Sequence, residues 1–250
     1  MKFAYKSDIG RVRTRNEDYV GLFKNKAGIE FAVLADGLGG HRGGDVASEM
    51  AVSHLGYRFE KTNFNKSDEG SEWLTTEVSK ENQQILERAQ QYEDLTGMGT
   101  TLVCALFFGN QCLLANIGDS RGYLYREGKL IQVTEDHSFV NELVKRGQIS
   151  SEEAKHHPQK NIITRTLGVS KNADLDEKIL ELEKDDLLLL CSDGLSNMVE
   201  DEQITRILQQ KTDLQVKCQQ LIEFANKAGG NDNITLLIAQ LTSKAEVEIR

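Results

Sequence analysis

Short apolar runs bounded by turn-forming residues recur through most of the chain. Runs of this length are typical of buried strands. Turns such as Lys26-Ala27-Gly28, Gly109-Asn110 and Glu127-Gly128 separate several of them, so neighbouring strands are expected to pair antiparallel. The predicted strands cover residues 3–6, 19–24, 30–35, 101–108, 112–117, 122–125, 130–134, 179–183, 187–191 and 234–241.

Helical periodicity occupies segments between these runs. Apolar residues recur at i, i+3 and i+4 over 46–55 and 214–225, which predicts two helices that each bury one face. His54 falls on the apolar face of the first helix and is therefore expected in the core.

A longer polar helix is predicted over about 73–90, after a polar loop at 63–71. Two short helices are expected within 135–168, the second opened by a capping box that starts at Ser150. Hairpins with helices outside them predict an α+β fold of two packed, mainly antiparallel sheets flanked by helices. We expect a single domain covering residues 1–250.

Composition narrows the classes of function. The net charge of -9 over 250 residues argues against general binding to nucleic acid or anionic lipid. No apolar stretch suits a secretory signal or a membrane span, so a cytoplasmic protein without stable membrane association is expected. The four cysteines show neither C-x-x-C nor C-x5-R spacing, which predicts buried thiols and excludes a cysteine-nucleophile phosphatase.

Four aspartates lie at the ends of predicted strands. Asp36 follows FAVLA, Asp193 follows LLLLCS, Asp119 follows LLANIG, and Asp232 precedes NITLLIAQL. Aspartate and glycine also form ordinary turns, which is the simpler interpretation of any single position. Packed sheets, however, would bring four such strand ends together at one rim.

Converging carboxylates would need protons or cations, because several of them cannot stay ionised together within a few Å. An all-oxygen ligand set without a histidine or cysteine cluster suits Mg²⁺ or Mn²⁺ rather than zinc. Two such ions about 3.5 to 4 Å apart can activate a shared water and stabilise an in-line displacement at phosphorus. The aspartate pattern therefore indicates hydrolysis of phosphate esters.

A second group of charged residues fits this chemistry. Arg11, Arg13 and Arg15 come just before Glu17 and Asp18. An arginine fork suits two phosphate oxygens, and nearby acids can hold metal-bound waters. The alternative is a charged surface turn.

Together these residues resemble the metal-dependent serine/threonine protein phosphatase family, type 2C, in its compact bacterial form. The resemblance runs from Ser7 to Ile238 in the family's order, so it covers nearly the whole chain. It is carried by the segments SDIGRVRTRNEDY, VLADGLGGHRGGDVAS, GMGTTLVCALF, ANIGDSRGYLY, VTEDHSFVNELV, LLLLCSDGLSNMV and GGNDNITLLI.

The resemblance implies an αββα sandwich with a dinuclear Mn²⁺ or Mg²⁺ centre at one end. Asp36 would bridge the two ions, and the carbonyl of Gly37 would bind one of them. Asp193 and Asp232 would complete the other. Asp119, together with Asp193, would hold a third, weaker ion.

The resemblance also implies roles around the metals. Arg13 would bind the substrate phosphate, while Glu17 and Asp18 would support metal-bound waters. The segment 135–168 would form the family's flap beside the active site. The implied reaction hydrolyses phosphoserine and phosphothreonine in proteins with a metal-activated water and no phosphoenzyme. A membrane serine/threonine kinase and its targets are the implied partners of an enzyme expected to be a monomer.

One position departs from many eukaryotic family members. They carry a histidine directly after the Asp-Gly pair as general acid, where this chain has Leu38. His41, three residues further on in a glycine-rich loop, is the candidate proton donor. A structural or merely solvated histidine is the alternative.

Three other functions fit parts of the sequence. Residues 37–43 superficially resemble a dinucleotide-binding turn, although Arg42 stands where the third glycine should be. Ser120 in a Gly-Asp-Ser segment could be a hydrolase nucleophile, but the last third of the chain has no histidine. A domain that binds phosphoproteins without catalysis is the third alternative.

Overall fold

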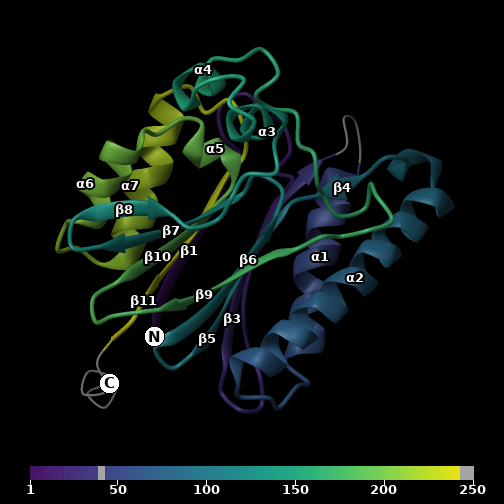
Figure 1. The fold of residues 1–250 in the computed structure, drawn as a ribbon, viewed down its shortest axis with the longest axis horizontal. Coiled ribbons are helices and arrows are strands. Elements are labelled where there is room, and N and C mark those ends of the chain that lie inside the picture. Colours follow the sequence, from purple (N-terminus) through teal and green to yellow (C-terminus); the bar gives the residue numbers. More distant parts are fainter. Residues whose placement is uncertain (39–42, 243–250) are drawn as a thin grey trace.

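Two antiparallel sheets packed face to face form the centre of the computed structural model, which describes residues 1–38 and 43–242 (Figure 1). The first sheet has the strand order β1-β11-β10-β7-β8. The second has the order β2-β3-β5-β6-β9, with the short β4 paired to β3. All these pairs are antiparallel, as the turns in the sequence predict.

The strands of the first sheet are β1 (Lys2–Asp8), β11 (Ile234–Gln240), β10 (Leu187–Cys191), β7 (Arg121–Arg126) and β8 (Lys129–Gln132). Those of the second are β2 (Asp18–Lys24), β3 (Glu30–Leu38), β5 (Leu102–Phe108), β6 (Gln111–Ile117), β9 (Asp176–Glu181) and β4 (Gly99–Thr100).

Helices cover the outer faces of both sheets (Figure 1). The second sheet is covered by α1 (Gly44–Phe59) and α2 (Ser67–Gln91), which is followed by the 3-10 turn η1 (Glu93–Leu95). The first sheet is covered by α5 (Asp193–Ser196), α6 (Asp201–Leu208) and α7 (Leu214–Lys227). At one end of the sandwich lie α3 (Phe139–Lys145) and α4 (Ser151–Lys155).

Three layers of apolar side chains hold this arrangement together, one between the sheets and one beneath each set of helices. Strand β11 contributes to two of them: Leu237 faces the other sheet and Leu236 faces the helices. Because both faces are buried, its sequence is a continuous apolar run rather than an alternating one. Each fully buried leucine contributes about 1.5 to 3 kcal/mol of transfer free energy.

The predicted α+β class is confirmed, and each predicted strand overlaps an observed one. Strand β4 was not predicted, because two residues are too few to produce a pattern. The expected loop at 63–71 is wrong in its second half, since α2 already begins at Ser67. Asp68 and Glu69 favour a helix start in the first turn, and Gly70 lets the helix approach Phe108 closely.

His54 also differs from its prediction. Its side chain is 46% exposed, and its Nδ1 lies 2.9 Å from Glu81 Oε1, so it belongs to a polar contact between α1 and α2 rather than to the core. The four cysteines are buried, as expected. Within residues 1–38 and 43–242, no helix is long and apolar enough to cross a membrane.

Candidate active site

The predicted aspartates meet at one rim of the sandwich because of strand pairing. Asp36 lies near the end of β3, and the β2–β3 register places Asp18 directly opposite it. Asp193 follows β10 at the start of α5, and Asp232 precedes the neighbouring β11. Asp119 lies in the turn between β6 and β7. We call these five residues the rim carboxylates.

The backbone of Asp36 is held by two threonines. Its carbonyl accepts hydrogen bonds from the Thr101 amide at 2.9 Å and from the Thr100 hydroxyl at 2.9 Å. Its own amide donates to Thr101 Oγ1 at 3.0 Å. These three bonds fix the peptide units on both sides of the Asp36 side chain.

Thr101 also positions the turn that carries Asp119. Its hydroxyl is 2.7 Å from that of Ser120, and both residues are fully buried. Gly118 has φ +102°, and a Cβ there would lie 2.6 Å from Thr101 Cγ2. One buried threonine therefore links the backbones beside two of the rim carboxylates.

Burial and mutual repulsion raise the pKa values of the rim carboxylates. The pKa of Asp36 is raised well above its usual range, first by burial and then by the charges of Asp18, Asp193, Asp119 and Asp232. Burial also raises the pKa of Asp18 to about 7 and that of Asp119 to about 8. These groups favour a proton, because each would otherwise be an anion among anions.

The pKa of Asp193 is raised to about 6, by burial and then by Asp232, while a hydrogen bond with the Asp36 side chain and the charge of Arg121 oppose this rise. Two carboxyl groups can share a hydrogen bond only if one carries a proton. Without a bound cation, protons must therefore neutralise part of the negative charge of the rim carboxylates.

Donor chemistry at the rim fits a hard divalent cation. Asp18 Oδ1 and Asp119 Oδ1 are buried and have no hydrogen-bond partner. Such orphaned oxygens are uncommon in folded proteins and are what an ion would satisfy. In the part of the chain that the structure describes, no group of three or more His, Cys, Asp or Glu side chains is arranged so that it could hold a metal ion. The carboxylate oxygens therefore lie at the same rim without surrounding one common point.

Arg13 stands at the edge of the rim. Its Nη2 donates to Asp232 Oδ2 at 2.8 Å, with the two side chains 48% and 35% exposed. Beside it, the pKa of Glu17 is raised, first by burial and then by Asp45. Arg13 is thus the predicted site residue that reaches a rim carboxylate directly.

Close packing explains the glycine after Asp36. A Cβ on Gly37 would lie 2.1 Å from the carbonyl oxygen of Gly44. The Gly37 amide donates a hydrogen bond to the Glu17 carbonyl at 3.0 Å. Glu17 in turn lies against Gly44, where a Cβ would be 3.0 Å from its carboxyl carbon. The start of α1 therefore packs directly on the strand end that carries Asp36.

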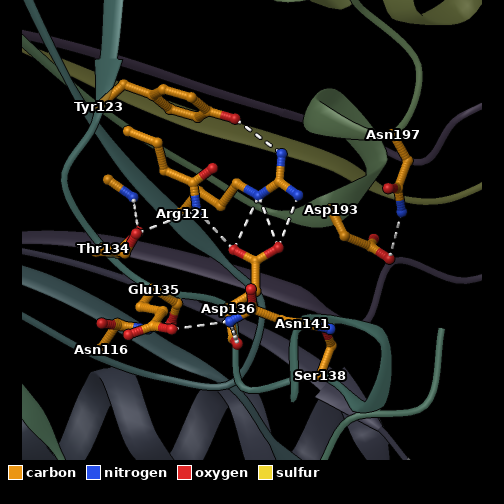
Figure 2. A network of polar contacts seen from close by, with 12 residues as sticks. Asn116, Arg121, Tyr123, Thr134, Glu135, Asp136, Ser138, Asn141, Asp193 and Asn197 are labelled. Carbon is orange, nitrogen blue, oxygen red and sulfur yellow. Dashed lines mark hydrogen bonds and ion pairs between the residues drawn. The ribbon is translucent and has the colours of Figure 1, made fainter. Parts of the chain in front are cut away.

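Sequence reasoning missed a partly buried cation beside the rim. Figure 2 shows the Arg121 guanidinium between Tyr123 and Asp136, close to Asp193. Arg121 Nη2 donates to Asp136 Oδ2 at 2.7 Å, and its Nη1 donates to the Tyr123 hydroxyl at 3.0 Å. The sequence offered only an arginine two residues after Asp119, which by itself does not reveal this contact.

The same network fixes the start of the predicted flap. Asn141 on α3 donates to the Asp136 carbonyl at 2.8 Å and to Glu135 Oε1 at 3.0 Å. Asn116 on β6 donates to the Glu135 carbonyl at 2.8 Å. The segment that leads into α3 and α4 is therefore anchored next to the rim. His41 lies outside the described residues.

Two alternative functions are excluded by this geometry. Strand β3 pairs antiparallel with β2 and β5, so the turn after Asp36 does not belong to a parallel dinucleotide-binding unit. Ser120 is fully buried with its hydroxyl on that of Thr101, and within residues 1–38 and 43–242 no histidine is hydrogen-bonded to it as a base.

Comparison with known proteins agrees with the site. Residues 10–236 match the family model described as Protein phosphatase 2C, so the chain belongs to the protein phosphatase 2C family of metal-dependent phosphatases. This confirms the resemblance seen in the sequence.

Two relatives match over nearly their full length. The chain is 46% identical over 241 residues to serine/threonine phosphatase stp of Listeria welshimeri, with 96% of each covered. It is 44% identical over 244 residues to protein phosphatase PhpP of Streptococcus pneumoniae, which covers 98% of this chain and 99% of that protein.

Solved structures share the fold. The serine/threonine phosphatase of S. agalactiae superposes with a TM-score of 0.92 at 43% identity, covering 95% of this chain and 98% of that one. Stp1 from Staphylococcus aureus has a TM-score of 0.93 at 40% identity, with 97% and 95% covered.

Proposed function

We propose that this chain is a serine/threonine protein phosphatase that uses two Mn²⁺ or Mg²⁺ ions and a third, weaker one. The main supporting observation is the gathering of buried carboxylates with orphaned oxygens at one rim. Family membership supports the reaction class, and the names of the relatives support phosphoserine and phosphothreonine as substrates.

Four of the five rim carboxylates, all except Asp18, are proposed as metal ligands together with the Gly37 carbonyl. When bound, the ions would supply an activated water and positive charge for the phosphoryl oxygens. The chain itself keeps the ligands in place, for instance through the threonines that hold Asp36, so little rearrangement is left for the reaction. The proposed ligands are Asp36, Gly37, Asp193 and Asp232 for the first two ions and Asp119 with Asp193 for the third.

Arg13 is proposed to orient the substrate phosphate. Its planar fork can donate two parallel hydrogen bonds to phosphate oxygens. In the structure one of its donors is bound to Asp232, so the phosphate would compete with that carboxylate for the guanidinium. Glu17 and Asp18 would hold metal-bound waters in place from behind the ligands.

The wider context follows from the same proposal. Residues 1–250 would form a single catalytic domain, with 135–168 as a flap whose beginning is anchored beside the rim. The enzyme would act in the cytoplasm as a monomer on phosphorylated proteins, and it would counteract a bacterial membrane serine/threonine kinase and its targets.

His41 is proposed as a candidate general acid, and two substrates can test this role. The leaving group of p-nitrophenyl phosphate needs no proton, whereas the alcohol of phosphothreonine does. His41→Ala should therefore slow turnover of a phosphothreonine peptide and spare p-nitrophenyl phosphate. Equal effects on the two substrates would contradict the role.

The activity itself is tested by turnover of p-nitrophenyl phosphate and a phosphothreonine peptide with Mn²⁺, Mg²⁺ or EDTA. We expect turnover that depends on the metal and disappears in Asp193→Ala. Circular dichroism of both proteins provides the control for folding. Folded protein without turnover in either metal would favour a domain that binds phosphoproteins without hydrolysing them.

A further inference from the structure

Three arginines project from one short loop at the rim. Arg11, Arg13 and Arg15 fall within five residues, and each is exposed. We call residues 9–16 the arginine loop. The whole chain carries a net charge of -9, so three arginines within five residues are a local exception to its acidic composition.

The arginine loop is held firmly against the segment that carries Asp232. The buried side-chain amide of Asn233 donates to the carbonyls of Ile9 at 3.0 Å and Arg15 at 2.8 Å. Its Oδ1 accepts the Glu17 amide at 2.8 Å. One asparagine next to Asp232 therefore fixes both ends of the loop.

The first half of the loop is equally constrained. Gly10 has φ +83°, and a Cβ there would lie 2.2 Å from the carbonyl oxygen of Asp232. The Arg11 amide donates to the Gly230 carbonyl at 2.7 Å. The backbone that presents these arginines is thus set before any ligand arrives, which lowers the entropic cost of binding.

The three guanidinium groups differ in what they already contact. Arg13 is paired with Asp232. Arg15 has no ion pair within 4.0 Å among the described residues, although its charge lowers the pKa of nearby Glu17. Arg11 likewise has no carboxylate partner in this part of the chain, and its stem packs on Gly230. Two exposed cations beside the proposed phosphate-binding arginine are therefore available to a ligand.

We propose that Arg11 and Arg15 bind acidic side chains that flank the phosphorylated residue, so that the enzyme prefers phosphoproteins with acidic flanks. This inference rests on the proposed phosphatase function. A substrate whose phosphate reaches Arg13 brings its neighbouring residues over the arginine loop.

The size of the preference follows from the exposure of these cations. Exposed ion pairs are weak individually and are screened by salt. Two of them together should give an acidic peptide about a three- to tenfold higher kcat/KM than a neutral one. Most of the difference should lie in KM, since the contacts are remote from the reacting bond.

The test uses two phosphothreonine peptides, one with glutamates and one with glutamines at the flanking positions. Wild type, Arg11→Gln, Arg15→Gln and the double variant are compared, with free Mn²⁺ held constant because glutamates bind the metal. Arg206→Gln removes the same charge from an exposed position on α6 and is the matched control. p-Nitrophenyl phosphate has no flanks and reports the basal activity.

We expect wild type and Arg206→Gln to prefer the acidic peptide, and the double variant to treat both peptides alike with unchanged p-nitrophenyl phosphate turnover. The preference should also shrink as salt rises. Equal kcat/KM for the two peptides in wild type, or an undiminished preference in the double variant, would overturn the inference while leaving the phosphatase function intact. No turnover of any phosphate ester would instead refute the proposed function itself.

Discussion

The negative charge of buried acids is balanced in different ways in two regions of this protein. Between α1 and α2, Glu81 is fully buried, with Arg58 Nη2 at 2.5 Å and His54 Nδ1 at 2.9 Å. Glu77 beside it contacts Arg58 Nε at 2.8 Å and Lys80 Nζ at 2.6 Å. We call these five residues the helix-pair cluster. Its carboxylates have cationic partners from the chain itself.

Among residues 1–38 and 43–242, the rim carboxylates have fewer such partners. Five acids meet there, and Arg13 reaches only the outermost of them, Asp232. Arg121 is close, but its guanidinium is already bound to Asp136. Burial and then the neighbouring negative charges raise the pKa values of Asp36 and Asp119, and two buried oxygens have no hydrogen-bond partner among the described residues. Buried acids by themselves therefore do not indicate a functional site, whereas buried acids with few cationic partners do.

Asp193→Asn should have the largest effect and separates function from stability. We expect turnover to fall by about a thousandfold or more, because a metal ligand worth several kcal/mol to the transition state is lost. The metal-free variant should nevertheless melt at a higher temperature than metal-free wild type, because a buried negative charge is removed. Kinetics with Mn²⁺ and thermal unfolding in EDTA measure the two effects. A lower melting temperature in EDTA would argue that Asp193 is a structural acid.

Arg58→Met removes a positive charge from the helix-pair cluster, whereas Asp193→Asn removes a negative charge from the rim. It leaves Glu77 and Glu81 buried without their main partner, which should cost about 3 kcal/mol or more of the free energy of unfolding. Urea unfolding measures the loss. The concentration of Mn²⁺ needed for half-maximal turnover should not change. If the variant were as stable as wild type, the contrast drawn between the two clusters would be wrong.

The pH dependence of stability should reveal the unpaired acids. Asp18, Asp119 and Asp193 have folded-state pKa values of about 7, 8 and 6, above the ordinary value near 3.8. At pH values between the ordinary pKa and the raised pKa of each group, the folded protein holds more protons than the unfolded chain. The free energy of unfolding therefore falls as pH rises through this range. The melting temperature in EDTA should therefore be lower at pH 8.5 than at pH 5.5.

Saturating Mn²⁺ should remove this loss, because the cation replaces the protons and binds only the folded protein. Melting curves with and without Mn²⁺ at the two pH values are the measurement. A metal-free melting temperature that stays constant or rises over this range would speak against the raised pKa values at the rim.

The smallest expected effect comes from changing Thr101, which holds the backbone of Asp36 in place. Thr101→Val keeps the shape but removes the hydroxyl shared with the Asp36 amide and Ser120. We expect Mn²⁺ affinity to fall about tenfold, as is typical when a residue that orients metal ligands is changed. Thr101→Ser keeps the hydroxyl and should bind Mn²⁺ nearly as wild type does. Calorimetric titration compares them, and equal losses in both variants would point to packing instead.

Much of the fold could be predicted from the sequence because apolar runs and turn glycines report local structure directly. Strand β11 is an example, since its continuous run matches burial on both faces. The start of α2 is not visible in the sequence, because residues 67–71 contain no large apolar side chain and such a first turn cannot be told from a loop by periodicity. Strand β4 is too short to leave any pattern.

For the site, the positions of the aspartates could be predicted, but not the way they are supported. An acid at the end of an apolar strand is visible in the sequence, and strand register then places Asp18 opposite Asp36. The pairing of Arg121 with Asp136 joins residues 15 positions apart across a turn, and the Thr101–Ser120 contact joins two separate strand ends. Neither contact has a spacing signal, because tertiary packing alone creates it.

Binding of Mn²⁺ shows whether the rim acids, which have one direct cationic partner within residues 1–38 and 43–242, take cations from solution. Equilibrium dialysis at neutral pH should compare the wild-type chain, Asp36→Asn and Arg58→Met. We expect at least two ions bound per wild-type chain, loss of this binding in Asp36→Asn and full retention in folded Arg58→Met. Folded wild-type protein that binds no Mn²⁺, or an Asp36→Asn variant that binds as much as wild type, would contradict it.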